Sequence, residues 1–231
     1  MSNFDPLKLA AWQCNQELPK SSLVIHTFGN ASACDRARGV FAIKPSGVPF
    51  SRLHPDDMVV VDLEGNIVEG RLRPSSDTRT HAVLYRSWPE IGGVVHTHSP
   101  YAVAWAQAGR PIPILGTTHA DSLAQDIPCT AVMSDAMIEG DYEECTGRMI
   151  VDAFAAMSHT EIEMVLVACH GPFTWGSTPE RAVENSVLLE MIARTAVMTL
   201  EINPDTPRLK PSLLRKHYER KHGPNAYYGQ R

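Results

Sequence analysis

The distribution of apolar residues along the chain predicts strands and helices that alternate. Two early runs rich in β-branched residues, 40–44 and 58–62, are bounded by glycine or proline and predict strands. Glu64-Gly65-Asn66 is typical of a hairpin turn, which would return the chain as a strand through residues 67–69. These short connections favour antiparallel pairing in this part of the sheet.

Helical patterns precede, separate and follow these strands. Residues 77–88, 142–157 and 179–200 are predicted to be helical, and the last of these segments is the longest. Near the start of the chain, Asp5-Pro6 predicts an N-cap followed by a proline in the first helical turn, and Pro19 is expected to end that helix.

Two further apolar runs predict buried strands. One covers residues 91–95 and continues through 96–98, and the other covers 164–169. Interleaved strands and helices indicate an α/β layered domain, and the hairpin-length connections favour a mixed or antiparallel sheet over a doubly wound one. We expect one domain over residues 1–231, because this length suits a single sizeable core.

Composition and charge narrow the classes of function. Hydrophobic residues make up 43% of the chain and charged residues 20%, which are ordinary values for a folded domain. A formal net charge of -5 argues against a nucleic-acid or anionic-membrane partner, since both favour a basic surface. The five cysteines form no CxxC pair and their number is odd, which suits the reducing cytoplasm. Neither a secretion signal nor a membrane span is expected.

Three histidines and an aspartate mark a candidate metal site. Alternate residues of a strand share a face, so His96 and His98 would project the same way with Cα atoms roughly 7 Å apart, close enough to bind one ion. His170 ends the later apolar run, directly before Gly171-Pro172, and would lie at a strand end beside a turn. Asp77 offers a carboxylate at the head of a helix. This set suits Zn²⁺, with Mn²⁺ or another divalent ion as the alternative.

The remaining histidines lack such a pattern. His217 is undecided on pattern alone. Packing or surface positions are the better interpretation for His26, His54, His81, His119, His159 and His222.

A cluster of small polar residues marks a candidate anion site. Pro74-Ser75-Ser76-Asp77 precedes a predicted helix, so backbone N–H groups and two hydroxyls would meet at the positive end of the helix dipole, which favours phosphate. An ordinary N-cap explains one of these residues but not the cluster, and both interpretations stand. Gly29-Asn30 and Lys44-Pro45-Ser46-Gly47 add an amide, a cation and a hydroxyl, although neither matches a P-loop or a dinucleotide-binding motif.

Taken together, seven groups of residues resemble the L-ribulose-5-phosphate 4-epimerase family of the class II aldolase superfamily, nearly end to end. They are Gly29-Asn30, Lys44-Pro45-Ser46-Gly47, Pro74-Ser75-Ser76-Asp77-Thr78, His96-Thr97-His98-Ser99, Gly116-Thr117-Thr118-His119-Ala120-Asp121, His170-Gly171-Pro172-Phe173, and Lys216-His217-Tyr218 with Ala226-Tyr227-Tyr228-Gly229-Gln230. The resemblance implies a three-layer α/β/α sandwich with a mixed, largely antiparallel central sheet, assembled as a homotetramer with fourfold symmetry.

The resemblance also implies roles for individual residues. The positions that match the family's metal site are Asp77, His96, His98 and His170. The positions that match its phosphate and substrate pocket are Asn30, Lys44, Ser46, Gly47, Ser75 and Ser76.

A neighbouring subunit completes the site in that family. Asp121 and Tyr228 match the acid/base pair that the neighbour supplies, and Thr117 and His217 match supporting polar positions in substrate binding. The chain departs from the family pattern at Phe28, where tryptophan is common, and Cys169, where serine is common. Both lie next to functional positions, so we expect them to alter the detail of the pocket and not its chemistry.

The implied reaction interconverts L-ribulose 5-phosphate and D-xylulose 5-phosphate. The hydrogen at C4 is not acidic, because the ketone lies two bonds away at C2. A retro-aldol cut between C3 and C4, followed by recombination on the other face of the aldehyde, avoids that deprotonation. Inversion needs proton transfer at the C4 hydroxyl from two opposite sides, so two acid/base groups are required.

Three alternatives to this function stay open. An aldolase of the same superfamily, such as one that cleaves L-fuculose 1-phosphate, would share the three histidines, but those aldolases resemble a pattern with glutamate at the position of Asp77. A non-enzymatic module like the adducin head would lack the histidine set. A 4-epimerase for another ketose phosphate, in arabinose, ascorbate or other pentose catabolism, would share every motif.

Overall fold

Seven strands form one antiparallel sheet in the computed structural model, which describes residues 2–229. The order of the strands across the sheet is β4-β3-β2-β1-β5-β7-β6. Their bounds are β1 Asn30–Asp35, β2 Val40–Ile43, β3 Val59–Asp62, β4 Ile67–Glu69, β5 Gly93–His96, β6 Met164–Val167 and β7 Gly171–Gly176. Gln230, which ends the last quoted motif, lies outside the described residues.

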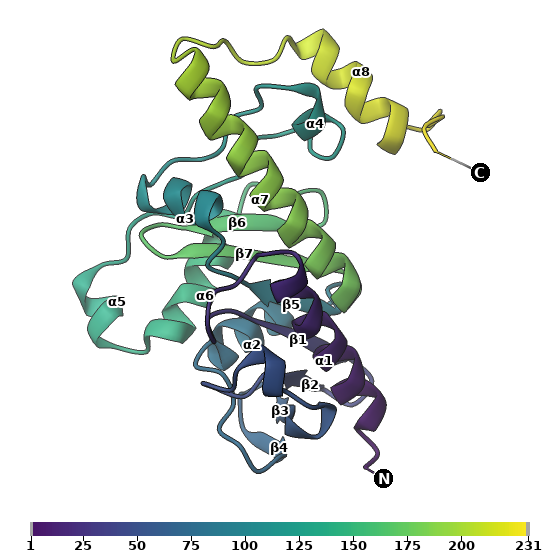
Figure 1. The fold of residues 1–231 in the computed structure, drawn as a ribbon, viewed down its shortest axis with the longest axis vertical. Helices are drawn as coiled ribbons and strands as arrows, with labels where there is room; N and C mark the ends of the chain where they lie inside the picture. Colours follow the sequence, from purple (N-terminus) through teal and green to yellow (C-terminus); the bar gives the residue numbers. More distant parts are fainter. Residues whose placement is uncertain (1, 230–231) are drawn as a thin grey trace.

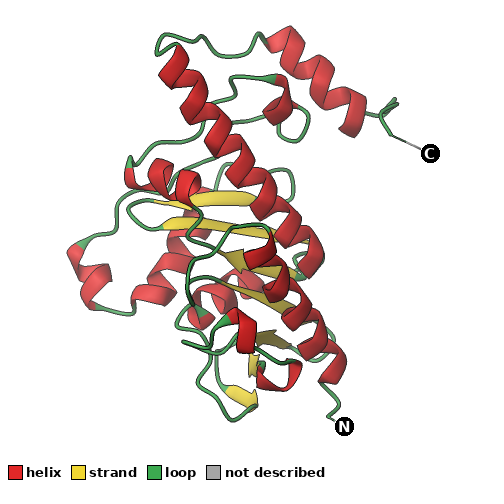
Figure 2. Ribbon diagram, in the orientation of Figure 1, coloured by secondary structure: helices red, strands yellow, loops and turns green. Residues whose placement is uncertain are grey.

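Helices lie on both faces of the sheet, and some extend beyond it (Figures 1 and 2). Their bounds are α1 Asp5–Lys20, α2 Thr78–Ser87, α3 Pro100–Gln107, α4 Thr117–Ala120, α5 Asp135–Glu139, α6 Tyr142–Ala153, α7 Pro179–Ile202 and α8 Pro211–His222. The long helix α7 runs from the sheet to the end of the molecule where α4 and α8 lie (Figure 1). None of the helices within residues 2–229 combines the length and the apolar composition needed to span a bilayer.

The alternation of side chains along the central strand shows which helices cover which face. Ala31 and Ala33 of β1 are buried in clusters with α1 residues, whereas the hydroxyl of Ser32 between them lies 2.7 Å from Nδ1 of His81 on α2. One face is therefore covered by α1 together with α3 and α7, and the other by α2 with α6 packed against it. This arrangement confirms the predicted three-layer α/β/α sandwich.

Several predicted elements agree with the structure. The runs 40–44 and 58–62 form β2 and β3, and the segment after the hairpin turn forms β4, which pairs with β3 in antiparallel orientation. Helix α7 covers the segment predicted at 179–200. Helix α1 continues one residue past Pro19, because a proline in the last turn removes only the hydrogen bond of its own nitrogen.

The sequence analysis missed the central strand, and the sheet that it predicted to be mixed or antiparallel is antiparallel throughout the described residues. Strand β1, Asn30–Asp35, was not predicted, because its small and polar residues have weak β-propensity, although it lies in the middle of the sheet. Every pairing between the described strands is antiparallel. A parallel contact remains only as an isolated bridge between Cys129 and Leu166 in the described chain.

Two strand boundaries also differ from the prediction. Strand β5 ends at His96, so His98 lies in the loop that follows and does not continue the strand. Gly171-Pro172 begins β7 and is not a turn. A proline is tolerated here because it lies near the start of the strand. Its carbonyl oxygen accepts a hydrogen bond from the backbone N–H of Thr97 and lies 2.9 Å from Nδ1 of His96.

A candidate active site at one end of the sheet

One end of the sheet gathers the termini of four strands. In antiparallel neighbours, the start of one strand lies beside the end of the next. Asn30 at the start of β1 is paired with His96 at the end of β5, and His96 is paired with Phe173 near the start of β7. Strand β2, which pairs with β1, ends at Ile43, directly before Lys44. Side chains far apart in the sequence therefore meet at this end.

The imidazoles of His96, His98 and His170 converge here, and one ring nitrogen of each lies within 4.8 Å of the others. The Nε2 atoms of His96 and His98 are 3.1 Å apart. Nδ1 of His96 lies 2.9 Å from the carbonyl oxygen of Pro172, an acceptor that favours the proton on Nδ1. This tautomer leaves the Nε2 lone pair directed at the other histidines.

Burial keeps the candidate ligands in the form that binds a metal. Burial, together with the nearby His96, lowers the pKa of His170 to about 4. The same two causes lower the pKa of His98 below its ordinary value. Neutral imidazoles with converging lone pairs are the donor set that a divalent cation requires, so the three histidines fit a metal ion.

Asp77 lies beside these histidines at the start of α2, but its ligand atoms are not part of the 4.8 Å group. Oδ2 of Asp77 accepts a hydrogen bond of 2.6 Å from Nδ2 of Asn30. Burial acts to raise the pKa of Asp77, but His96, His81 and the hydrogen bond from Asn30 outweigh it and hold the pKa below its ordinary value. The carboxylate is therefore ionised next to the site, where it can balance the charge of a bound cation.

A cavity of about 300 Å³ joins the histidines to the predicted anion site. The residues that line it come from both sets: Thr27, Phe28, Gly29, Asn30, Lys44, Pro45, Ser46, Gly47, Ser75, Ser76, Asp77, His96, His98 and His170. The metal-ligating and phosphate-binding groups predicted separately from the sequence thus share one pocket.

Lys44 is the cation of this cavity. Its side chain is buried, its Nζ lies 3.4 Å from the carbonyl oxygens of Thr27 and Pro45, and the same atom lies 4.7 Å from the ring centroid of Phe50. Burial lowers the pKa of Lys44 to about 8. Lys44 is consequently charged at neutral pH and would gain a strong hydrogen bond from a phosphate in the cavity.

The hydroxyl of Ser75 has two partners inside the protein. Its Oγ lies 3.1 Å from Nδ2 of Asn30 and 3.3 Å from the backbone nitrogen of Asp77, while its own backbone N–H donates to the carbonyl oxygen of Lys44 at 3.0 Å. The prediction that these backbone N–H groups point to an anion is therefore wrong for Ser75 and Asp77. Lys44 and the serine hydroxyls on the cavity wall are the groups that can meet one.

The two departures from the family pattern flank the histidines. The ring of Phe28 lies 5.8 Å from that of His98 and is tilted against it, and 56% of the side chain is exposed. Cys169 adopts a left-handed backbone conformation with φ of 62° immediately before His170. It turns the chain between β6 and β7, and its backbone N–H donates to the carbonyl oxygen of Ala106.

The predicted acid/base and supporting residues lie away from this cavity. Asp121 and Thr117 belong to the segment of α4, which packs on α8 at the end of the molecule beyond the sheet (Figure 1). Nδ1 of His217 lies 2.9 Å from Oδ1 of Asp121. Tyr228 follows α8, and 62% of its side chain is exposed. None of these four residues lines the histidine cavity within the described chain.

Two contacts of the candidate site residues were missed by the sequence analysis. Arg220 donates to both carboxylate oxygens of Asp121, and its position three residues after His217 on a helix was a usable signal, since such residues share a face. The hydroxyl of Tyr142 lies 3.4 Å from Nδ1 of His170, and no spacing in the sequence indicates this contact.

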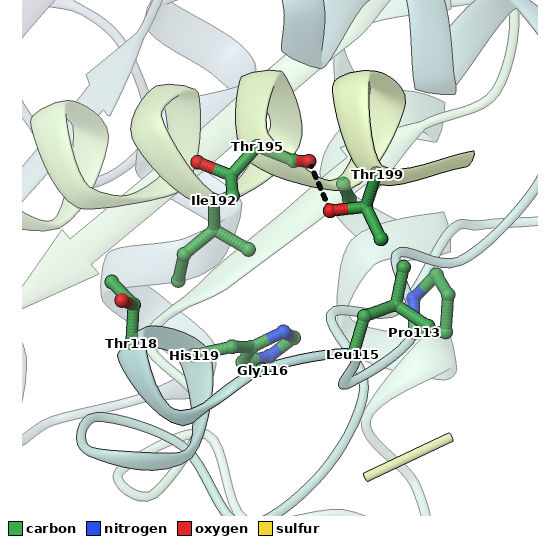
Figure 3. Close-up of a pocket in the computed structure, with 9 residues that line it drawn as sticks. Pro113, Leu115, Gly116, Thr118, His119, Ile192, Thr195 and Thr199 are labelled. Carbon is green, nitrogen blue, oxygen red and sulfur yellow. Dashed lines mark hydrogen bonds between the residues drawn. The ribbon is translucent and has the colours of Figure 1, made fainter. Parts of the chain in front are cut away.

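A smaller cavity of about 90 Å³ separates α7 from the segment that leads into α4 (Figure 3). The imidazole of His119 lies on one side of it, across from Thr195 and Thr199 on α7 (Figure 3). His119 is only 5% exposed, and burial lowers its pKa to about 4. The structure thus confirms that His119 is a packing residue, here between α4 and α7.

Comparison with known proteins finds a matching family model and similar proteins of nearly the same length. Residues 10–197 match the family model described as Class II Aldolase and Adducin N-terminal domain. The chain is 50% identical over 225 residues to proteins named L-ribulose-5-phosphate 4-epimerase UlaF from Salmonella paratyphi A and Salmonella typhi. These alignments cover 97% of this chain and 99% of each relative.

Solved structures agree with the fold. An L-fuculose 1-phosphate aldolase superposes with a TM-score of 0.78 at 23% identity, covering 95% of this chain and 97% of the other. The l-fuculose-1-phosphate aldolase from Thermus thermophilus gives a TM-score of 0.66 at 28% identity, covering 88% of this chain and 98% of the other. A structure of YgbL from Klebsiella pneumoniae, described as a putative aldolase/epimerase/decarboxylase, gives 0.71 at 22% identity, with 94% and 99% covered.

Proposed function

Since this chain belongs to the class II aldolase and adducin N-terminal domain family, we propose that it is a metal-dependent sugar-phosphate 4-epimerase that interconverts L-ribulose 5-phosphate and D-xylulose 5-phosphate. The observation that carries this proposal is the single cavity that holds three converging histidines beside a buried lysine and serine hydroxyls. A full-length identity of 50% to 4-epimerases supports the same substrate.

The metal half of the cavity is assigned to His96, His98 and His170, with Asp77 as a further ligand or charge partner. Zn²⁺ is the proposed ion, because imidazole and carboxylate donors suit it, and Mn²⁺ is the alternative. When bound, such an ion would supply Lewis acidity that stabilises the negative charge left on the three-carbon fragment after the C3–C4 bond breaks.

The anion half is assigned to the phosphate. Lys44 offers a charge, Ser46, Ser75 and Ser76 offer hydroxyls, and Gly47 and Asn30 complete the wall of the same cavity. Holding the phosphate keeps the two-carbon aldehyde fragment in place while it rotates, so that recombination is intramolecular and the fragment is not released.

The acid/base pair is assigned to Asp121 and Tyr228, with Thr117 and His217 as supporting residues. They lie beyond the sheet in this chain, so we propose that they serve the cavity of a neighbouring subunit in a fourfold-symmetric homotetramer. The five cysteines have no disulfide partner, which supports a reducing, cytoplasmic location. We retain one domain over residues 1–231.

An aldolase that releases its fragments is the second candidate, because solved aldolases share the fold. Asp77 is the feature that favours epimerisation: the resembling aldolases carry a glutamate at this position, whose longer side chain can reach a substrate as a base. Here the Asp77 carboxylate is instead held by Asn30.

NMR of the purified protein with L-ribulose 5-phosphate tests the proposal. We expect D-xylulose 5-phosphate as the product, with little free glycolaldehyde phosphate, and we expect a chelator to abolish the conversion until a divalent metal is restored. Released fragments without a C4 epimer would replace this proposal with the aldolase. Full activity of verified metal-free protein would rule out the metal mechanism.

A further inference from the structure

The Asp121 carboxylate is bound on both oxygens by one helix. Nε of Arg220 donates to Oδ1 at 2.9 Å and Nη2 donates to Oδ2 at 2.7 Å, in a bidentate pair. His217 lies 2.9 Å from Oδ1 on the same face of α8. The ring of His222 contacts the backbone carbonyl oxygen of Asp121 at 3.0 Å, which ties the end of α4 to the end of α8.

Arg220 also contacts the second proposed acid/base residue. Its guanidinium carbon lies 5.0 Å from the ring centroid of Tyr228. Its carbonyl oxygen accepts hydrogen bonds from the backbone N–H groups of Tyr227 and Tyr228 at 3.0 and 3.2 Å. One residue therefore links the carboxylate and the phenol that the reaction needs on opposite faces of C4.

The contact also sets the charge of the carboxylate. Burial acts to raise the pKa of Asp121, but the hydrogen bonds from Arg220 and His217 outweigh it and hold the pKa below its ordinary value. An epimerase that transfers protons on two faces requires one group ionised and one protonated at neutral pH. Asp121 is suited to be the ionised group of the pair.

We propose that Arg220 is the positioning residue of the acid/base pair, holding Asp121 ionised and oriented while it fixes Tyr228 beside it. This inference rests on the proposed 4-epimerase function. Arg220 acts through Asp121 and is not assigned a contact with the substrate, because two of its nitrogens are committed to the carboxylate and the phosphate has its own cation in Lys44.

Other charged and titratable groups surround Asp121. Arg220, His217, Lys221 and His222 face it from α8, and the tail adds Tyr227 and Tyr228 next to Arg220. On its own helix, His119 points away into the contact with α7 (Figure 3). Changing Arg220 alone leaves these groups in place.

The experiment compares the full-length protein with Arg220→Gln, Arg220→Lys and the control Arg215→Gln. Arg215 is an exposed cation on α8 five residues earlier, which places it on a different face of the helix. Steady-state rates with L-ribulose 5-phosphate are measured against pH. The titration of the Asp121 carboxyl carbon is followed by ¹³C NMR, using Asp121→Asn to assign the signal.

Arg220→Gln should lower kcat by about 10²-fold, the order expected when a reacting group is displaced by about 1 Å, with little change in KM. Activity needs ionised Asp121, so the acid limb of kcat/KM should move to higher pH, and the ¹³C titration should move with it. Arg220→Lys should recover part of both shifts, because it keeps the charge but loses the bidentate geometry. Arg215→Gln should match the parent.

Two results would overturn the assignment of Arg220. An unchanged ¹³C titration in both Arg220 variants would show that Arg220 does not set the state of Asp121. A raised KM with unchanged kcat would show that Arg220 binds the substrate directly. If the parent protein converts no ketose phosphate, the proposed function fails, and the NMR comparison identifies that case separately because it needs no activity.

Discussion

At the scale of single residues, the cavity combines neutral imidazoles with one buried cation. The metal half needs lone pairs, and burial provides them by lowering the pKa of His98 and His170. The phosphate half needs positive charge, and the same burial brings the pKa of Lys44 down to about 8. Burial thus favours the neutral, metal-binding form of His98 and His170, whereas it limits the pH range over which Lys44 can bind a phosphate.

This difference predicts an alkaline limit on catalysis. The Lys44 charge is present below about pH 8 and is lost as the pH rises through that value, so kcat/KM for L-ribulose 5-phosphate should fall above it. Lys44→Met should lower kcat/KM by about 10- to 100-fold at neutral pH, the value of a charged hydrogen bond. Steady-state pH profiles measure both effects.

Lys44→Arg provides the matched control for the alkaline limb. Arginine stays protonated at these pH values, so the limb should disappear or move to higher pH if Lys44 causes it. An identical limb in the parent and in Lys44→Arg would assign the fall to another group.

At the scale of secondary-structure elements, the site depends on how closely the chain before β1 approaches the end of β5. Gly29 has a φ of 88°, and a Cβ atom built there would lie 2.9 Å from the carbonyl oxygen of His96 and 2.9 Å from Cγ1 of Val24. No other residue type suits both the left-handed backbone and the space. The position of His96 at the end of β5 thus relies on the glycine directly before β1.

Gly29→Ala should therefore both destabilise the protein and disturb the metal site. We expect a loss of roughly 2–5 kcal/mol in the free energy of unfolding, from backbone strain plus overpacking, and weaker metal binding through His96. Gly109→Ala is the control, since Gly109 has a φ of 61° but open space around its Cβ position, and should cost only the backbone strain of roughly 1–2 kcal/mol. Denaturant titration and metal analysis would check this. Equal stability losses in the two variants would show that crowding at Gly29 has no effect.

At the scale of the whole molecule, the two halves of the proposed chemistry lie far apart in one chain. The histidine cavity is at one end of the strands, whereas Asp121, His217 and Tyr228 gather where α4 meets α8 beyond the sheet (Figure 1). The tail around Tyr228 is held by its own helix through Arg220, and the Tyr228 ring remains mostly exposed. An exposed tyrosine ring at this end of the molecule is accessible to the active site of a partner subunit.

Complementation between two inactive variants tests the shared site. His98→Ala should lose the metal site, and Asp121→Asn should lose an acid/base step worth about 10²- to 10⁴-fold in rate. In a cyclic oligomer every interface joins two different patches, so random equal mixing after subunit exchange should rebuild roughly a quarter of the sites with both parts intact. The measurement is the recovered epimerase rate, with mixing verified by native mass spectrometry.

The two variants each mixed with themselves are the control and should stay inactive. If verified mixed oligomers were as inactive as either parent, then the metal and the acid/base groups would come from one chain and the shared-site model would fail.

The sequence by itself determined the chemistry of the candidate site and much of the local structure. Hydrophobic periodicity and turn residues are local patterns, which can be recognised within a short stretch of sequence. Strands β2 and β3 and helix α7 could therefore be predicted from them. The residue types fixed which metal ligands and which cation are available, namely His96, His98, His170 and Lys44. Burial then lowered the pKa values of His98, His170 and Lys44.

Only the tertiary structure decided which of these residues meet. Strand order and register arise from pairings between distant segments, and the chain reveals little of them locally: β1 is small and polar, yet it pairs Asn30 with His96 and completes the cavity. The same holds for Arg220, whose role depends on α8 packing against α4. Local patterns specify the elements and their faces, whereas the meeting of strand ends and helix ends is set by the long-range packing of the whole sheet and its helices.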